Sequence, residues 1–395
     1  MDYHNQPKIP MSSPDLTEAE RQAVLEVVET NYLSMGPKIT AFEAAMCEFT
    51  GSRHAIAVNS GTSGLHLCVH AAGIKRGDYV ITTPFSFVSS TNVILFENAI
   101  PIYVDVDPQT GNINPDAVKE AAHDLMKGGN AARRWLPRKG APENGTLKAI
   151  LSVDVFGQPA DFDPLHKVAE RFNLRLINDS CEALGAEYKG IKAGRLGDYG
   201  VFAFYPNKQI TTGEGGVIVT DNDEAAILMR ALRNQGRMPH DTWLTHSMLG
   251  YNYRMPEMSA ALGVVQMSRI EELLTQRKKV ADWYNQHLAS IPEVEAPILV
   301  ESTTRTSWFV YVVRITKDVN REETIEQLKE RSIPVRPYFS PIHLQPYMIE
   351  RFGYQLGDFP ITDELGSRSL ALPFSGIMTE NQVIQVCTAL EDCIR

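Results

Sequence analysis

The sequence contains few cysteines and no long hydrophobic run. Its five cysteines are an odd number among 395 residues, and no two of them form a CxxC pair. A disulfide framework or a zinc ribbon needs closely spaced or paired cysteines, so we expect free thiols and no metal site. No stretch reaches the roughly 18 consecutive apolar residues of a membrane helix, and residues 1–10 lack the apolar core of a signal peptide. We therefore expect a cytoplasmic protein that is not bound to a membrane.

Positive charge is also in deficit. The chain has 38 lysines and arginines against 48 aspartates and glutamates, which gives a net charge of -10. A nucleic-acid partner attracted by a broad basic surface is therefore not expected, and any bound anion must be held by a local site. The GxGxxG and GxxxxGK fingerprints are absent as well. Dinucleotide and nucleoside triphosphate sites of those kinds are accordingly disfavoured.

The overall composition is that of an ordinary globular protein. Hydrophobic residues make up 43% of the chain and charged residues 22%, which excludes wholesale disorder, collagen-like repeats and a coiled coil. A chain of 395 residues exceeds what one hydrophobic core usually organises. We expect a large domain over residues 1–270 and a smaller one over residues 271–395, with the boundary inside a long helix predicted at residues 256–290.

Short runs rich in valine and isoleucine alternate with helical stretches along the first half of the chain. This rhythm is typical of parallel strands whose sheet is covered by helices on both faces. We therefore predict an α/β fold whose large domain has a mostly parallel central sheet between helices. The strands are predicted at residues 54–58, 79–82, 102–105, 149–155, 174–179, 200–205 and 216–220.

Residues beyond 291 show a different mixture of elements. Strands are predicted at residues 308–315 and 333–336, one helix follows a cap at Asn320, and a last helix begins at Thr379. The C-terminal part is therefore predicted to be a smaller α+β domain. Residues 126–147 fit no element, because they combine several glycines and prolines with basic side chains, and we expect a surface loop there.

Three features at predicted strand ends carry chemistry. Residues 58–64 read VNSGTSG, where a strand ends in small residues and a helix begins, so that free N–H groups and the Thr62 and Ser63 hydroxyls can bind a phosphate. Asp179 closes a buried strand, at the edge where open α/β sheets bind ligands. Lys208 follows the next strand and precedes a glycine-rich turn. Each feature alone is common: a helix cap, a capping carboxylate or a solvated lysine.

Together the three features match the needs of one cofactor. Pyridoxal phosphate requires a lysine amine for a covalent link, a carboxylate that pairs with its pyridine nitrogen and an anion site for its phosphate. Lys208, Asp179 and the turn from Gly61 to Ser63 supply these groups. We therefore predict a pyridoxal 5'-phosphate site.

The motifs around these residues are specific. They include SGTSGLHL, TPFSFVSSTN, INDSCEALGAEYKG, FYPNKQITTGEGG, GYNYRMPEMSAALG and RPYFSPIHLQPY. In their order and in their residues they resemble the DegT/DnrJ/EryC1/StrS family of pyridoxal-phosphate-dependent sugar aminotransferases, which have the type I fold of aspartate aminotransferase. The resemblance covers nearly the whole chain.

The resemblance implies a role for each residue of the cofactor site. Lys208 binds the cofactor covalently and later moves the proton during amino transfer. Asp179 pairs with the pyridine nitrogen, Phe87 stacks on the ring, and Thr62 and Ser63 hold the phosphate. Lys208 and Asp179 are thus the predicted catalytic residues.

The resemblance also extends to the rim of the site. Asn252 matches a family asparagine that reaches the phosphate from a neighbouring subunit, which implies a homodimer with shared active sites. Glu182 stands where many relatives have a glutamine near the cofactor's phenolic oxygen, so we expect it to contact the cofactor. Arg254, Tyr338 and His343 lie in motifs that line the sugar-nucleotide site in relatives, and for His343 a packing role is an equal alternative.

The implied reaction moves an amino group from glutamate to a keto-sugar attached to a nucleotide diphosphate. We favour a 4-keto-6-deoxy sugar because the motifs around Asp179 and Lys208 look closer to that branch, with a 3-keto sugar as the alternative. A sugar 3-dehydratase would have histidine in place of Lys208. A regulatory role is opposed by the net charge of -10 and the complete catalytic set.

A few positions depart from the family pattern. Ala203 stands five residues before Lys208, where a serine commonly helps to hold the phosphate. That contact is therefore lost here. Asp154 and Gln235 occupy positions where histidine is frequent, and residues 126–147 are longer than the usual connection.

Overall fold

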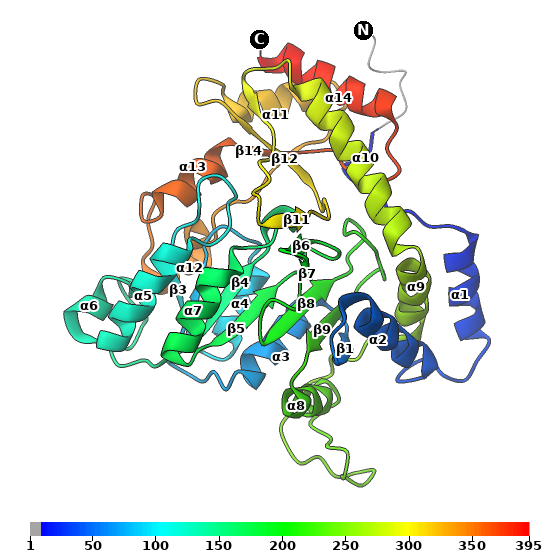
Figure 1. Ribbon diagram of the computed structural model, residues 1–395, viewed down its shortest axis with the longest axis vertical. Coiled ribbons are helices and arrows are strands. Elements are labelled where there is room, and N and C mark those ends of the chain that lie inside the picture. The colour runs from blue at the N-terminus through cyan, green and yellow to red at the C-terminus, as the bar shows by residue number, and fades with distance from the viewer. Residues whose placement is uncertain (1–8, 395) are drawn as a thin grey trace.

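A seven-stranded sheet forms the centre of the molecule (Figure 1). The computed structural model describes residues 9–394. The strand order is β1-β9-β8-β5-β4-β2-β3. Neighbouring strands from β8 to β3 run parallel, whereas β9 is antiparallel to both β1 and β8. The strands are β1 (His54–Val58), β2 (Tyr79–Thr82), β3 (Ile100–Tyr103), β4 (Leu147–Val153), β5 (Arg175–Asp179), β8 (Tyr199–Ala203) and β9 (Gly216–Thr220).

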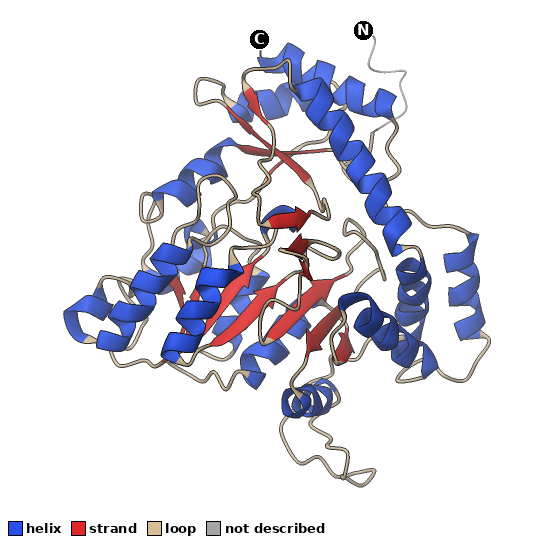
Figure 2. Ribbon diagram, in the orientation of Figure 1, coloured by secondary structure: helices blue, strands red, loops and turns tan. Residues whose placement is uncertain are grey.

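Helices cover both faces of this sheet, because successive residues of the strands are apolar and point to both faces (Figure 2). In β1, Ile56 and Val58 belong to the core beneath α3 (Gly61–Ala71) and α8 (Asp223–Arg233). Ala55 and Ala57, which point the other way, belong to the core beneath α2 and α9. The other covering helices are α2 (Pro37–Thr50), α4 (Ser89–Phe96), α5 (Pro115–Lys127), α7 (Phe162–Phe172) and α9 (Glu257–Ser268).

A second sheet of four antiparallel strands lies at the C-terminal end and has its own core (Figure 1). Its order is β10-β12-β14-β13. The predicted division after residue 270 falls at the start of α10, and the domain boundary itself stays a prediction. The elements are β10 (Val294–Glu295), β12 (Tyr311–Ile315), β13 (Arg336–Pro337), β14 (Ser369–Leu372), α10 (Ile270–Leu288), α11 (Arg321–Glu330) and α14 (Glu380–Ile394).

The remaining elements are short or peripheral. A three-stranded sheet of order β11-β6-β7 lies between the two larger sheets in Figure 1. Of the helices in residues 9–394, none has both the length and the apolar character needed to cross a membrane. These elements are α1 (Glu18–Val28), α12 (Pro346–Phe352), α13 (Pro360–Arg368), β6 (Glu187–Tyr188), β7 (Ile191–Lys192) and β11 (Thr303–Arg305).

The structure corrects some predicted boundaries. The single helix predicted at residues 256–290 is two helices, α9 and α10, which meet at Arg269. The predicted strand at residues 308–315 begins only at Tyr311, since Trp308 has a positive φ of 48°.

The predicted loop at residues 126–147 is partly helical, because α5 continues to Lys127 and α6 (Gly129–Arg133) follows. Two of its arginines are held by carboxylates: Arg134 forms an ion pair with Asp124, and Arg138 with Asp358. The segment is therefore held against α5 and the region before α13.

Candidate active site

A cavity of about 470 Å³ lies where the central strands end and α3 begins. Because β5 and β8 are parallel neighbours, the last residue of β5, Asp179, and the turn after β8, which carries Lys208, meet at the same edge. Several predicted residues therefore line one cavity. Its lining consists of Ser60, Gly61, Thr62, Ser86, Phe87, Ser89, Val153, Asp179, Cys181, Glu182, Ala203, Tyr205, Asn207, Lys208, Glu214, Gly215 and Tyr338.

The N-terminus of α3 forms one wall. Ser60 caps the helix, since its Oγ accepts a hydrogen bond from the Ser63 N–H at 3.1 Å. Gly61 packs so closely that a Cβ atom there would lie 2.7 Å from the Cβ of Ala203, so only glycine fits. N–H groups of a first helical turn have no partner within the helix, and they carry a partial positive charge. This wall is therefore suited to an anion.

Thr62 lines the cavity, but Ser63 does not. The Ser63 hydroxyl instead donates to Asn59 Oδ1 at 2.6 Å. Its side chain thus serves the turn before α3. A phosphate contact from Ser63 would have to come from a reoriented hydroxyl.

Asp179 lies at the floor of the cavity and is 5% exposed. The hydroxyl of Ser90 donates to Oδ2 at 2.9 Å, and the N–H of Cys181 donates to Oδ1 at 3.2 Å. The Ser86 hydroxyl lies 2.8 Å from that of Ser90. The carboxylate is therefore held in one orientation by groups from α4 and from the turn after β5.

Lys208 extends into the same cavity, with its side chain 13% exposed. Its Nζ atom lies 3.7 Å from Glu182 Oε1 and 3.8 Å from the centre of the Phe309 ring. A carboxyl group and an aromatic face thus flank the amine.

Glu182 is bound on its other oxygen as well. Oε2 accepts a hydrogen bond from the Phe156 N–H at 3.0 Å. Burial raises the pKa of Glu182 to about 7, although the nearby Lys208 acts in the opposite direction. Near neutral pH this carboxyl can therefore hold or release a proton beside the lysine amine.

Aromatic side chains surround the mouth. Phe87 is 60% exposed and Tyr205 is 53% exposed, although both line the cavity. Tyr338 lines it from the C-terminal part of the chain, and burial raises the pKa of its hydroxyl. These rings are available to contact a bound ligand.

The remaining predicted residues lie outside the cavity lining. Asn252 is exposed and forms an isolated β-bridge with Asn234. Arg254 donates a hydrogen bond to the side-chain oxygen of Asn234 at 3.0 Å. His343 is 0% exposed, with its Nε2 3.1 Å from Asp363 Oδ1 and its ring against Phe359. The structure therefore does not bring His343 to the cavity, and packing accounts for its position.

Sequence reasoning missed several residues of the site. Ser86 and Ser90 are close together in TPFSFVSSTN, but no local pattern indicates that Ser90 contacts Asp179, which lies 89 positions away. Phe309 carries no local signal either, because it lies far from Lys208 in the sequence.

The chain is similar to known proteins over almost its full length. The sequence profile of the DegT/DnrJ/EryC1/StrS aminotransferase family matches residues 14–391. GDP-perosamine synthase of Caulobacter vibrioides is 37% identical over 391 residues, which cover 98% of this chain and 99% of that protein. The spore coat polysaccharide biosynthesis protein SpsC of Bacillus subtilis is 33% identical over 401 residues, which cover 98% of this chain and 97% of that protein.

Solved structures share the fold. PseC of Helicobacter pylori, an aminotransferase involved in the biosynthesis of pseudoaminic acid, superposes with a TM-score of 0.87 at 26% identity, covering 98% of this chain and 99% of that one. DesV of S. venezuelae, solved in complex with a ketimine intermediate, superposes with a TM-score of 0.85 at 26% identity, and the match covers 98% of each chain.

These similarities confirm the predicted fold class, an α/β transferase fold with a mostly parallel central sheet. They also confirm that the protein is an enzyme. As its motifs predicted, the chain belongs to the DegT/DnrJ/EryC1/StrS aminotransferase family.

Proposed function

We propose that this aminotransferase uses pyridoxal 5'-phosphate to move an amino group from glutamate to C4 of a nucleotide-diphosphate-linked 4-keto-6-deoxy sugar. The observation that carries the proposal is that Lys208, Asp179 and the N-terminus of α3 line one cavity. Relatives named GDP-perosamine synthase and spore coat polysaccharide biosynthesis protein support a nucleotide-linked sugar and a role in polysaccharide synthesis.

The cavity fits this cofactor in size and in chemistry. Its volume of about 470 Å³ lies within the range of small-molecule sites, roughly 300–1,000 Å³. A lysine amine, a buried carboxylate and a helix N-terminus face it from three different elements. The Gly61 backbone, which has no room for a side chain, would bring the helix N–H groups to the phosphate.

When bound, pyridoxal phosphate supplies an electron sink for the negative charge that develops at the reacting carbon. Lys208 would hold the cofactor covalently and then accept at Nζ the proton that leaves the amino-bearing carbon of glutamate. Asp179, fixed by Ser90 and Cys181, would keep the ring nitrogen protonated. Phe87 and Tyr338 would cover the ring and the sugar at the mouth.

Glu182 adds a proton site that the glutamine of many relatives does not offer. Below its pKa of about 7 the neutral carboxyl can donate a hydrogen bond, and above it the carboxylate can pair with the Lys208 ammonium. We infer that Glu182 exchanges its proton during the reaction cycle, when the charge on Lys208 changes.

We also propose a homodimer with shared active sites in the cytoplasm. Asn252 is exposed and lies outside its own cavity, so it is available to a neighbouring subunit. The segment after α8, which projects at the bottom of Figure 1, carries Trp243, Leu244 and Leu249, which are 79%, 84% and 87% exposed. Apolar side chains gathered in this way are typical of an interface.

Borohydride reduction tests the cofactor assignment. We expect the purified protein to be yellow, and peptide mapping after reduction to find a pyridoxyl group on Lys208. Lys208→Ala should lose both the covalent link and turnover while it keeps the thermal unfolding midpoint of the cofactor-free protein. A pyridoxyl group on any other lysine would contradict the assignment.

The raised pKa of Glu182 predicts a pH-dependent stability. Its folded-state pKa of about 7 exceeds its usual value of 4.5, so this group stabilises the fold below about 4.5 and loses that contribution as the pH rises to about 7. Glutamine does not ionise. The unfolding midpoint of cofactor-free Glu182→Gln, relative to that of the unsubstituted protein, should therefore increase between pH 5 and pH 8.

Glu214→Gln makes the same chemical change at an exposed position of the same cavity and serves as the matched control. If the Glu182→Gln difference is the same at both pH values, the carboxyl does not titrate as the structure indicates.

Mixed dimers test the shared site. Subunits with Lys208→Ala are combined with subunits that carry Asn252→Ala. If Asn252 serves the neighbour's cofactor, each hybrid has one site free of both substitutions, and activity should recover to a fraction set by the hybrid content. Confirmed subunit exchange without any recovery would mean that each site is built from one chain.

The regiochemistry is tested with keto-sugar nucleotides. Incubation of the holoenzyme with glutamate and a nucleotide-linked 4-keto-6-deoxyhexose should yield a 4-amino product, identified by the proton NMR shift and couplings at H4. Amination of a 3-keto isomer only would overturn the C4 assignment and leave the aminotransferase intact. Loss of water from C3 without amination would favour the dehydratase alternative.

A further inference from the structure

Arg277 is a buried cation directly behind the turn that carries Lys208. It lies on α10 and is 4% exposed. Its Nη2 donates to the main-chain carbonyls of Asn207 and Lys208 at 3.3 and 2.5 Å. Its Nη1 donates to the carbonyls of Trp308 and Phe309 at 3.2 and 3.1 Å. One guanidinium thus joins α10 to the Lys208 turn and to the segment that leads into β12.

The charge of Arg277 faces these carbonyl dipoles and the ring of Phe374, whose centre lies 5.7 Å from Cζ. Desolvation lowers the pKa of Arg277 to about 10, and within residues 9–394 no carboxylate forms an ion pair with it. A buried charge without a counter-ion is costly, and an apolar side chain would fill such a helix position at lower cost. The need for a guanidinium here is therefore geometric: its fork directs several N–H groups at carbonyls from two separate segments.

The contacts continue on both sides of the lysine. The Gln209 side chain donates to Ser307 Oγ at 2.8 Å and to the Glu182 carbonyl at 2.6 Å. The Lys208 amine lies 3.8 Å from the centre of the Phe309 ring. The Lys208 N–H donates to the Tyr205 carbonyl at 2.9 Å. Both polar groups of the Lys208 main chain are thus engaged, and Arg277 holds the carbonyl.

We propose that Arg277 is a positioning residue for Lys208. It clamps the backbone of the turn to Trp308 and Phe309 and thereby sets where the amine lies relative to Asp179 and to the carbon that loses its proton. Arg277 is absent from the lining of the active-site cavity, so it acts through the turn and not directly on a bound ligand. The inference rests on the proposed role of Lys208 in proton transfer.

A misplaced amine slows proton transfer more than it weakens binding, because displacements of about 1 Å can cost about 100-fold in rate. In Arg277→Lys one ammonium replaces the fork and cannot reach both segments with the same geometry. We expect kcat for the reaction with glutamate to fall about 10- to 100-fold with a small change in KM. Glutamate deuterated at the amino-bearing carbon should show a larger isotope effect than with the unsubstituted enzyme, because proton transfer becomes more rate-limiting.

A second measurement does not depend on turnover. In the full-length protein loaded with the cofactor, hydrogen–deuterium exchange should accelerate in peptides that cover residues 205–210 and 307–309. It should remain unchanged in peptides from the central strands. Arg277→Gln keeps an amide donor and provides the same comparison if Arg277→Lys does not fold.

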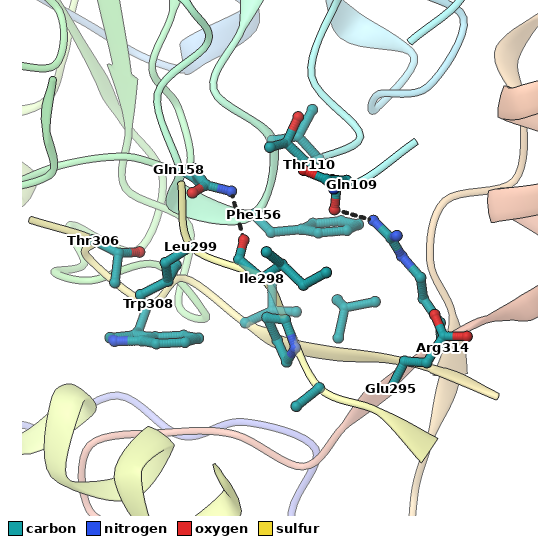
Figure 3. A pocket seen from close by; sticks show the side chains of 15 residues that line it. Gln109, Thr110, Phe156, Gln158, Glu295, Ile298, Leu299, Thr306, Trp308 and Arg314 are labelled. Atoms are coloured by element: carbon teal, nitrogen blue, oxygen red, sulfur yellow. Dashed lines mark hydrogen bonds between the residues drawn. The ribbon is translucent and has the colours of Figure 1, made fainter. Parts of the chain in front are cut away.

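Arg314 offers a matched control. It also donates to main-chain carbonyls, that of Pro108 at 2.5 Å and that of Gln109 at 2.6 Å. The bond to Gln109 is drawn in Figure 3, and it joins β12 to the loop that follows β3. The cavity that Arg314 lines there has a volume of only about 40 Å³ and does not include Lys208. Arg314→Lys should therefore leave the isotope effect and the exchange of residues 205–210 at the values of the unsubstituted enzyme.

The outcomes separate the two proposals. Equal isotope effects and equal exchange in the Arg277 and Arg314 variants would overturn the positioning role. The positioning role would also be overturned if the loss of turnover matched the loss of folded protein. The same holds if both Arg277 variants failed to fold while Arg314→Lys folded. If the unsubstituted protein carries no pyridoxyl group on Lys208, the proposed function fails, whereas the exchange comparison still decides whether Arg277 fixes the turn.

Discussion

The parallel pairing of β5 with β8 is the constraint on which the site depends. In this register Asp179 stands opposite Val201, so β8 ends only two residues further along, at Ala203. The turn that follows β8 must then start beside the carboxylate. A slip of one residue would turn Asp179 to the opposite face of the sheet. The separation between the Asp179 carboxylate and the Lys208 turn thus depends on the main-chain hydrogen bonds that pair β5 with β8.

Small residues at the same edge allow the anion-binding wall to approach. Gly61 lies against Ala203, and Gly216 of β9 lies so close to Ser60 that a Cβ atom would be 2.7 Å from its carbonyl carbon. Compared with alanine, a serine at position 203 would add only a hydroxyl group. Ala203 therefore leaves the close approach of the Gly61 backbone unchanged. The proposed phosphate site would therefore rely chiefly on main-chain N–H groups, which do not require the serine that is common in the family.

Carboxyl groups crowd this edge of the sheet. Asp154 accepts hydrogen bonds from Asn178 and Ser180, which flank Asp179, and burial raises its pKa to about 7, as it does for Glu182. Burial is the larger cause in both cases, and the charge of Asp179 adds to it. This edge of the sheet thus holds two carboxyl groups, Asp154 and Glu182, whose protonation is near balance at neutral pH.

The strands that end at this edge could be predicted from the sequence because their residues form a local pattern. Strands buried on both faces appear as short apolar runs. Asp179 is the last residue of β5, and Lys208 lies five residues after β8 ends at Ala203. Contacts between residues that are far apart in the sequence produce no comparable local pattern. Arg277 lies 69 residues from Lys208, and nothing in its helical surroundings distinguishes it from an exposed arginine. His343 shows the converse, since its motif left a ligand contact and a packing role as equal alternatives and the fold buries it against Phe359.

The two bridging arginines show how the parts of the molecule are joined. Arg277 and Arg314 both donate to main-chain carbonyls and not to the carboxylates that this acidic chain has in excess. A carbonyl belongs to the backbone, so a bond to it fixes the path of the chain, whereas a bond to a carboxylate fixes only a side-chain rotamer. For Arg314 the path is that of a loop after β3. For Arg277 it is the turn of Lys208, so any shift of residues 307–309 with the four-stranded sheet must act on the amine.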